Sequence, residues 1–333
     1  MQFIEIRNFT CEGGAQYDVL ALSYQVFGQP LHSAPVILVN HALTGNSDVL
    51  SEERGWWRDL AGSSKLLNTE KYTIIAFNIP GNGYDGSLIS SYRDWTAKDV
   101  ARLFCQGLDV LGVDRLFVAI GGSLGGGIAW EIAGLRPAYI DYLIPVASDW
   151  KASDWIIGHN AIQESILLNS TKPLEDARKM AMLFYRSPES FRKRFQRKKS
   201  RVPGQFDVVS WLEGHADKIK QRFKLQAYLM MNHLLTTLDA SAGAESFEDR
   251  FAELQSVVIQ IAVRSDIFFN PEENERTREK LDYLGIRNHL FIVDSDDGHD
   301  AFLIEHKQIT NFLNDFLAFK SYEDLKVRGQ VSR

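Results

Sequence analysis

Ser123 stands in a short glycine-rich sequence, Gly121-Gly122-Ser123-Leu124-Gly125, which fits the pattern G-x-S-x-G. An apolar run precedes this sequence and a helical pattern follows it, which is the context that a nucleophile elbow requires. Glycines on both sides allow the sharp turn, and the helix N-terminus favours developing negative charge. The alternative is a serine that only caps a helix. A phosphate loop in its usual form is excluded because no Gly-Lys-Ser/Thr follows.

A nucleophilic serine needs a base and an acid, and the fold that carries this elbow orders them as Ser, then Asp or Glu, then His. Among the eight histidines, only His299 lies in a short loop after the final apolar run, where Gly298 lets the chain turn. Asp266 directly follows the preceding run and would fix the imidazole tautomer. The rival acids share the histidine's own strand end and loop; they are Asp294, Asp296 and Asp297. We predict a triad of Ser123, Asp266 and His299.

The negative charge that forms when a serine attacks a carbonyl needs two backbone N–H donors. Leu124, the residue after the nucleophile, supplies one, and the loop after an earlier strand supplies the other. That loop is 41–45, directly after an apolar run, and we predict Leu43 as its donor. His41 is a candidate second base in the same loop, but a role in holding the turn by hydrogen bonds is the preferred interpretation.

The elements that must position these residues alternate along the chain as short apolar runs and helical patterns. Such alternation is typical of βαβ units in a mostly parallel sheet, whose buried strands are continuously apolar. The predicted strands are 36–40, 72–78, 116–121, 142–147, 257–263 and 289–293, with 3–9 and 19–27 as an antiparallel edge. A final helix is predicted from an apolar stripe of Ile309, Phe312, Leu313, Phe316 and Leu317.

Residues 149–247 contain no strand-like run and predict helices rich in Arg, Lys, Leu, Met and aromatic residues. The simplest interpretation is a helical insertion that lies over the carboxyl ends of the strands. The predicted organisation is a core formed by 1–148 and 248–333, with 149–247 as a helical lid. The predicted fold class is α/β, with a mostly parallel sheet and helices on both faces.

Composition limits the class of protein. Of the 333 residues, 45% are hydrophobic and 24% charged, as in globular proteins, and a net charge of −6 gives no reason to expect nucleic acid as partner. No apolar run could span a bilayer and no signal peptide is recognised, so we expect a cytoplasmic protein without a membrane partner. Cys11 and Cys105 are far apart and predict neither disulfides nor a metal site.

Several stretches of the sequence resemble the homoserine O-acetyltransferase family, acyltransferases of methionine biosynthesis built on the α/β-hydrolase fold. The matching stretches are 41–45, 121–126, 265–266, 298–303 and, in the predicted lid, 177–187 and 191–195. The resemblance implies transfer of an acetyl group from acetyl-CoA to the side-chain hydroxyl of L-homoserine through an acyl-serine. Acetyl-CoA is then a co-substrate, and no cofactor is bound permanently.

The resemblance also implies residues that bind the substrate. Arg178 and Tyr185 in the lid are implied to hold homoserine, and a guanidinium suits its carboxylate because it offers two parallel hydrogen bonds. Asp300, beside the catalytic histidine, is implied to bind the substrate ammonium, and Thr44 is assigned to the same substrate-binding group. A homodimer formed through the helical insertion is implied as well.

The sequence departs from the family mainly in the lid. The segment between the elbow and Arg178 is shorter than usual, and 78–86 replaces a longer glycine-rich signature. Arg222-Phe223 is retained from a further motif, but Lys224 and Leu225 replace its usual polar pair. A serine hydrolase that lost the acceptor site is therefore the alternative function, and a noncatalytic binding protein is a second. A succinyl donor or a serine acceptor also stays open.

The predicted lid carries one strongly basic run, 192–201, with seven Lys or Arg residues. Charge runs usually face water, so a solvated lid helix is the preferred interpretation. The phosphates of coenzyme A are the alternative partner.

Overall fold

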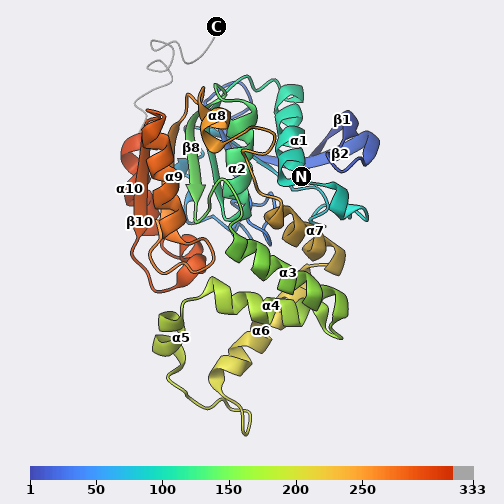
Figure 1. Cartoon of the computed structure of the whole chain (residues 1–333), viewed down its shortest axis with the longest axis vertical. Helices are drawn as coiled ribbons and strands as arrows, with labels where there is room; N and C mark the ends of the chain where they lie inside the picture. Colours follow the sequence, from blue (N-terminus) through green and yellow to red (C-terminus); the bar gives the residue numbers. More distant parts are fainter. Residues whose placement is uncertain (318–333) are drawn as a thin grey trace.

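The computed structural model describes residues 1–317, and an eight-stranded sheet runs through them in the order β1-β2-β6-β3-β7-β8-β9-β10 (Figure 1). The strands are β1 (Gln2–Thr10), β2 (Gln16–Gly28), β3 (Val36–Asn40), β6 (Thr73–Phe77), β7 (Leu116–Gly122), β8 (Ile140–Val146), β9 (Val257–Val263) and β10 (Asn288–Val293). All pairings from β6 to β10 are parallel, whereas β1 and β2 form an antiparallel edge. The predicted strands and the antiparallel edge are confirmed. A separate two-stranded sheet pairs β4 (Ala61–Gly62) with β5 (Leu67–Asn68).

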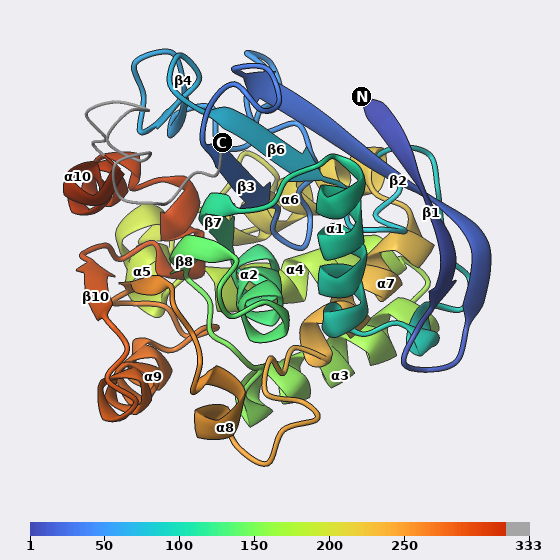
Figure 2. The same cartoon turned by 90° about the horizontal axis from the view of Figure 1, so that it is seen from above.

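Helices cover both faces of the sheet, as Figure 2 shows from above. They are α1 (Ala97–Val110), α2 (Leu124–Leu135), α8 (Phe247–Phe251), α9 (Pro271–Tyr283) and α10 (His306–Leu317). Neighbouring strand residues point to opposite faces, so Leu38 packs in the cluster that contains α1 and α2, while Ile37 packs in the cluster that contains α10. Both faces are therefore apolar, which explains the continuously hydrophobic central strands.

The segment between β8 and α8 forms the helices α3 (Asp154–Asn169), α4 (Pro173–Tyr185), α5 (Pro188–Phe195), α6 (Asp207–Arg222) and α7 (Leu225–Thr236). Figure 1 shows α3 to α6 grouped at the end of the sheet toward which the β8 arrow points. We call these five helices the lid. Among the helices of residues 1–317, none is both long and apolar enough to cross a membrane.

The basic run in the lid differs from the predicted solvated helix. Helix α5 ends at Phe195, and the next two residues, Gln196 and Arg197, have positive φ angles of 49° and 58°. A left-handed backbone at two successive residues cannot continue a right-handed helix. Only the first part of the run is therefore helical, and the remainder lies in the connection to α6.

The turn from β7 into α2 is built on glycines that let backbone segments meet. A Cβ atom on Gly125 would lie 2.7 Å from the carbonyl carbon of Asn40 and 2.8 Å from the carbonyl oxygen of His41. A side chain on Gly122 would meet the ring of Phe302, which follows β10. The turn after β7 therefore packs directly against the loop after β3 and the loop after β10.

We expect Gly125→Ala to lower the free energy of unfolding by about 1–3 kcal/mol, because the added methyl group would force the two backbone segments apart. Gly158→Ala is the control, since a Cβ there meets nothing within 4 Å in helix α3. Alanine favours helices, so the control should raise stability by up to about 1 kcal/mol. Urea denaturation measures both, and equal stability of the two variants would contradict this account.

Candidate active site

Ser123 occupies the strained turn between β7 and α2. Its φ of 55° and ψ of −125° lie in a region that residues other than glycine rarely adopt, as expected for a nucleophile elbow. The backbone N–H of Ser123 donates to the carbonyl oxygen of Val146 on β8 at 2.9 Å. The neighbouring strand therefore holds the turn, and the serine is only 4% exposed.

The structure brings the three residues of the predicted triad into one chain of hydrogen bonds. His299 Nε2 lies 2.9 Å from Ser123 Oγ, and His299 Nδ1 lies 2.7 Å from Asp266 Oδ2. With the Nδ1 proton directed to the carboxylate, Nε2 is left to accept the serine proton. This is the arrangement that a general base for serine requires.

Asp266 is fixed by backbone donors from its own loop. Its Oδ1 accepts the N–H groups of Phe268 at 2.7 Å and Phe269 at 2.9 Å, which leaves Oδ2 for His299. The three rival carboxylates pair with cations instead: Asp294 with Arg264, Asp296 with Lys193, and Asp297 with Arg186. Only Asp266 among these four carboxylates contacts the imidazole.

Aromatic rings surround the imidazole of His299. The ring centroids of Phe268, Phe269, Phe302 and Tyr185 lie 5.1 to 5.6 Å from its own. The first three come from the loops after β9 and β10, whereas Tyr185 comes from the lid. These rings bury His299 to 3% exposure and keep bulk water away from the hydrogen bonds of the triad.

The loop after β3 lies against the elbow, where a second oxyanion donor would be needed. Leu43 is in this loop and Leu124 is the first residue of α2. His41 holds the loop: its Nδ1 lies 2.8 Å from the carbonyl oxygen of Ala42, and its Nε2 accepts the N–H of Ile79 at 3.0 Å. Burial lowers the pKa of His41 to about 4. These contacts match the turn-holding interpretation of this histidine.

The lid is joined to the histidine loop by Arg186, which sequence reasoning did not assign to the site. Its Nε donates to Asp300 at 3.0 Å, and its Nη1 bonds Asp297. Ser190 adds a hydrogen bond to Asp297 at 2.8 Å. Burial raises the pKa of Asp300, while the positive charges of Arg186 and Arg178 oppose this rise. Asp300 thus faces the lid as a buried carboxylate that already has one cationic partner.

Arg178 and Tyr185 lie on the same face of helix α4 and contact each other beside the triad. The guanidinium carbon of Arg178 lies 5.6 Å from the ring centroid of Tyr185, and that ring is 5.6 Å from the imidazole of His299. Burial, and after it the neighbouring phenol of Tyr228 on α7, raises the pKa of Tyr185 well above its ordinary value, and Tyr228 itself is 1% exposed. Tyr228 was missed by sequence reasoning, although its place six residues after Arg222 in the partly retained motif was a usable signal.

Thr44 forms a hydrogen bond with one side chain of the lid. Arg222 Nη2, at the end of helix α6, donates to Thr44 Oγ1 at 3.3 Å. Because Thr44 follows Leu43, this contact connects α6 to the loop of the predicted oxyanion donor.

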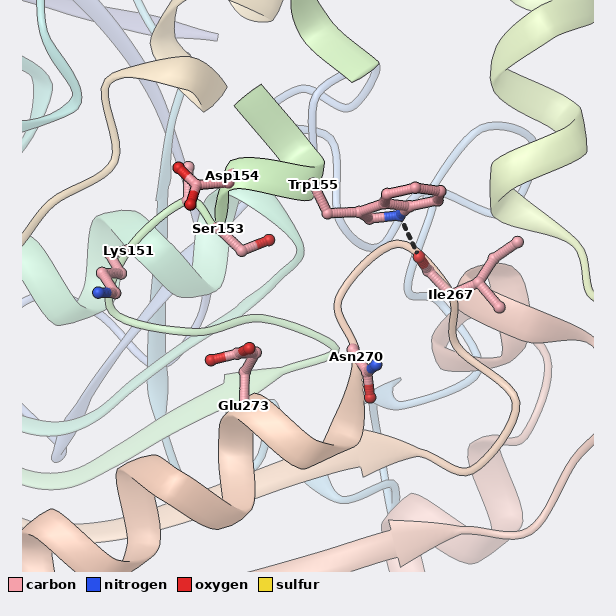
Figure 3. Close-up of a pocket in the computed structure, with 8 residues that line it drawn as sticks. Lys151, Ser153, Asp154, Trp155, Ile267, Asn270 and Glu273 are labelled. Atoms are coloured by element: carbon pink, nitrogen blue, oxygen red, sulfur yellow. Dashed lines mark hydrogen bonds between the residues drawn. The ribbon is translucent and has the colours of Figure 1, made fainter. Parts of the chain in front are cut away.

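A second lid helix contacts the loop of Asp266 from the other side. Trp155, at the start of α3, donates its indole N–H to the carbonyl oxygen of Ile267 at 2.6 Å (Figure 3). A polar pocket of about 580 Å³ lies beside this contact, lined in part by Lys151, Asp154 and Glu273. The acid loop is therefore supported by the lid as well as by the sheet.

No group of three or more His, Cys, Asp or Glu side chains in residues 1–317 is arranged to hold a metal ion. The polar groups at the site are the triad, the carboxylate of Asp300 and the guanidinium groups of Arg178, Arg186 and Arg222. Such a set can carry out acyl transfer through a serine and bind a substrate that has charges of both signs.

Comparison with known proteins gives a consistent result. A family model described as alpha/beta hydrolase fold matches residues 35–305. A homoserine O-acetyltransferase of Trichormus variabilis is 30% identical over 348 aligned positions, which cover 95% of this chain and 94% of that protein. The crystal structure of a homoserine O-acetyltransferase from Staphylococcus aureus matches with a TM-score of 0.81 at 26% identity, over 96% of both chains. The crystal structure of esterase E22 matches with a TM-score of 0.84 at 17% identity, over 95% of this chain and 99% of that one, which shows a shared fold.

We expect Ser123→Ala to abolish labelling by a fluorophosphonate probe and His299→Ala to slow it by roughly a thousandfold or more, because the serine is then not activated. Ser148→Ala is the matched control, since Ser148 is a buried serine beside the elbow whose Oγ has no hydrogen-bond partner in the described residues. The rate of labelling, followed by mass spectrometry, tests both assignments. Labelling of His299→Ala at the rate of the control would rule out the proposed base.

Proposed function

The chain belongs to the homoserine O-acetyltransferase family of α/β-hydrolase-fold proteins, and we propose that it moves an acetyl group from acetyl-CoA to the side-chain hydroxyl of L-homoserine. The observation that carries the proposal is the 2.9 Å contact between Ser123 Oγ and His299 Nε2, with Arg178 of the lid lying over Tyr185 beside the same imidazole. Similarity to homoserine O-acetyltransferases over nearly the whole chain supports the choice of acceptor and donor.

The first half of the reaction loads the serine. His299 Nε2 takes the proton of Ser123 as Oγ attacks the thioester carbonyl of acetyl-CoA. The backbone N–H groups of Leu43 and Leu124 bind the oxyanion of the tetrahedral intermediate. Coenzyme A leaves as the thiol after it receives the proton from His299, and an acetyl-serine remains.

The second half transfers the acetyl group to the acceptor. The side-chain hydroxyl of homoserine gives its proton to the same nitrogen of His299 and attacks the acetyl-serine carbonyl. Collapse of the intermediate releases O-acetylhomoserine and returns the proton to Ser123 Oγ. Asp266 stays ionised throughout and stabilises the imidazolium that forms in both halves.

The acceptor is held by its two charged groups. Arg178 binds the carboxylate through its planar guanidinium, and Asp300 accepts the ammonium. Arg186 anchors the Asp300 carboxylate, so that the ammonium meets an oriented acceptor. Tyr185 and Thr44 complete the substrate contacts. Fixing both ends of the amino acid directs its hydroxyl toward the acetyl-serine.

A transferase must favour an alcohol over water, and the burial of the site supports transfer rather than hydrolysis. Ser123, Asp266 and His299 are each 4% exposed or less, and Tyr185 from the lid lies over the imidazole. A dry site slows hydrolysis of the acetyl-serine until the acceptor arrives. A serine hydrolase on the same fold is the alternative function.

We place the protein in the cytoplasm, in methionine biosynthesis, as a homodimer that associates through the lid. Support for the dimer comes from four large apolar side chains on the lid helices α3 and α4, because contact with a second copy would remove them from water. Trp155, Ile162, Leu168 and Leu183 are each at least half exposed.

The proposed function is tested by coenzyme A release with and without acceptor. We expect a single rapid release of about one coenzyme A per serine with acetyl-CoA alone, and continuous turnover only when L-homoserine is added. Succinyl-CoA and L-serine are tested in the same assay and should react poorly. Equal steady-state release with and without homoserine would identify a hydrolase instead.

We expect Arg178→Lys to raise the KM for homoserine and to reduce kcat/KM roughly tenfold to a hundredfold, because an ammonium cannot replace the bidentate contact of a guanidinium. The matched control is Lys179→Gln, which removes an exposed ion pair to Asp176 from the next position of the same helix. Steady-state kinetics at saturating acetyl-CoA measure both variants. Unchanged kinetics of Arg178→Lys would remove this residue from the acceptor site.

A further inference from the structure

Arg222, an exposed residue at the end of helix α6, places a guanidinium group beside the active site. It bonds Thr44, which is neutral, and it forms no ion pair with a carboxylate of residues 1–317. Arg178 likewise bonds no carboxylate in that range, since Asp300 is bonded to Arg186 instead. Two arginines with free charge therefore remain at the site.

The two guanidinium groups are close enough to repel each other. Helices α4 and α6, which carry them, pack side by side in the lid. Desolvation lowers the pKa of Arg222 from its ordinary value, and the positive charge of Arg178 lowers it further. His215, on the same helix α6, adds no charge near neutral pH because burial and nearby cations lower its pKa to about 4. Two like charges held near each other repel, and an anion bound between them would offset that repulsion.

We propose that Arg222 is the second cation of the acceptor site, so that the carboxylate of the acceptor lies between Arg178 and Arg222. The proposal rests on the proposed function and adds a specificity-determining residue to it. Each guanidinium donates to the carboxylate, while one remaining N–H of Arg222 keeps its bond to Thr44.

The positions of the two arginines favour a small carboxylate over a phosphate of coenzyme A. Arg178 lies over Tyr185, whose ring contacts His299, and Arg222 contacts Thr44, the neighbour of Leu43. Both therefore lie close to the reacting atoms. In acetyl-CoA the long uncharged pantetheine arm separates the thioester from the phosphates, so phosphates belong farther out.

The contact with Thr44 gives the second arginine a further consequence. Because Arg222 already bonds Thr44, a carboxylate bound between the two arginines would be connected through Arg222 to the loop 41–45, which carries the predicted oxyanion donor Leu43. Binding of the correct acceptor then supports the hole that stabilises the second tetrahedral intermediate. An alcohol without a carboxylate gains nothing from this arrangement.

The test compares L-homoserine with 3-aminopropan-1-ol, which keeps the ammonium and the hydroxyl but lacks the carboxylate. We expect Arg222→Gln to reduce kcat/KM for homoserine roughly tenfold to a hundredfold, the loss typical of one charge-assisted hydrogen bond, and to change the value for 3-aminopropan-1-ol less than about threefold. The rapid release of coenzyme A from acetyl-CoA alone should fall no more than the value for 3-aminopropan-1-ol, because neither step involves a carboxylate of the acceptor. Equal losses for both acceptors, or loss of the rapid release, would overturn the proposal.

Lys220→Gln is the matched control, because it removes one positive charge from the same helix while the lysine pairs with Glu175 away from Thr44. It should leave both acceptors unchanged within about twofold, since exposed ion pairs contribute little. If Lys220→Gln reproduces the loss seen with Arg222→Gln, a general effect of lid charge replaces the specific contact.

Calorimetric titration of L-homoserine into Ser123→Ala separates this proposal from the proposed function. We expect Arg222→Gln in that background to raise the Kd roughly tenfold or more. An unchanged Kd would overturn the role of Arg222 even if transfer occurs. Binding that depends on Arg222 but is followed by no transfer in the wild type would support the second cation and contradict the proposed function. No binding to either protein would overturn both.

Discussion

The approach of the turn after β7 to the loop after β3 is the constraint on which the site depends. Gly125 has no side chain, so its backbone lies against the carbonyl groups of Asn40 and His41. Ser123 is held in an unfavourable backbone conformation by its bond to Val146, and packing of the surrounding sheet compensates for that strain. The same contact sets the nucleophile beside the loop of the predicted oxyanion donor. A looser turn would separate the two groups that the reaction needs together.

The lid covers the site, and it also forms ion pairs and hydrogen bonds that hold the loops of His299 and Asp266. Arg186 links the end of helix α4 to Asp297 and Asp300, which flank the loop of His299. Trp155 links α3 to the loop of Asp266. The loops that carry His299 and Asp266 are therefore both held by contacts from the lid. This coupling offers a physical reason why a change of lid can change an enzyme of this fold from hydrolysis to transfer.

The charged groups around the serine differ in whether they have a partner of opposite charge or a hydrogen-bond donor. Asp266 bonds backbone donors and His299, and Asp300 bonds Arg186. Within residues 1–317, Arg178 and Arg222 form no ion pair with a carboxylate. Two neighbouring guanidinium groups repel each other, and a bound anion would relieve that repulsion. Hydrolases that act on neutral esters have no need of such a pair. The imbalance thus favours a substrate that brings a negative charge to a fixed position.

The sequence by itself determined where the strands lie along the chain, the elbow and the family, because these depend on local patterns. G-x-S-x-G between an apolar run and a helix has few other uses, and Gly298 marks the turn before His299. Family stretches around Thr44, Arg178 and Asp300 pointed to an amino-acid acceptor. Contacts between distant residues left no such local mark.

The tertiary structure decided the contacts that the sequence did not predict. Position after a strand already favoured Asp266 as the partner of His299, and the structure shows where the rival carboxylates go: they turn to Arg264, Lys193 and Arg186, while Asp266 bonds the imidazole. The contacts of Arg222 with Thr44 and of Tyr228 with Tyr185 likewise join separate helices and loops. Backbone patterns fix where an element begins and ends, but the partner of a charge depends on the packing of the whole lid against the sheet.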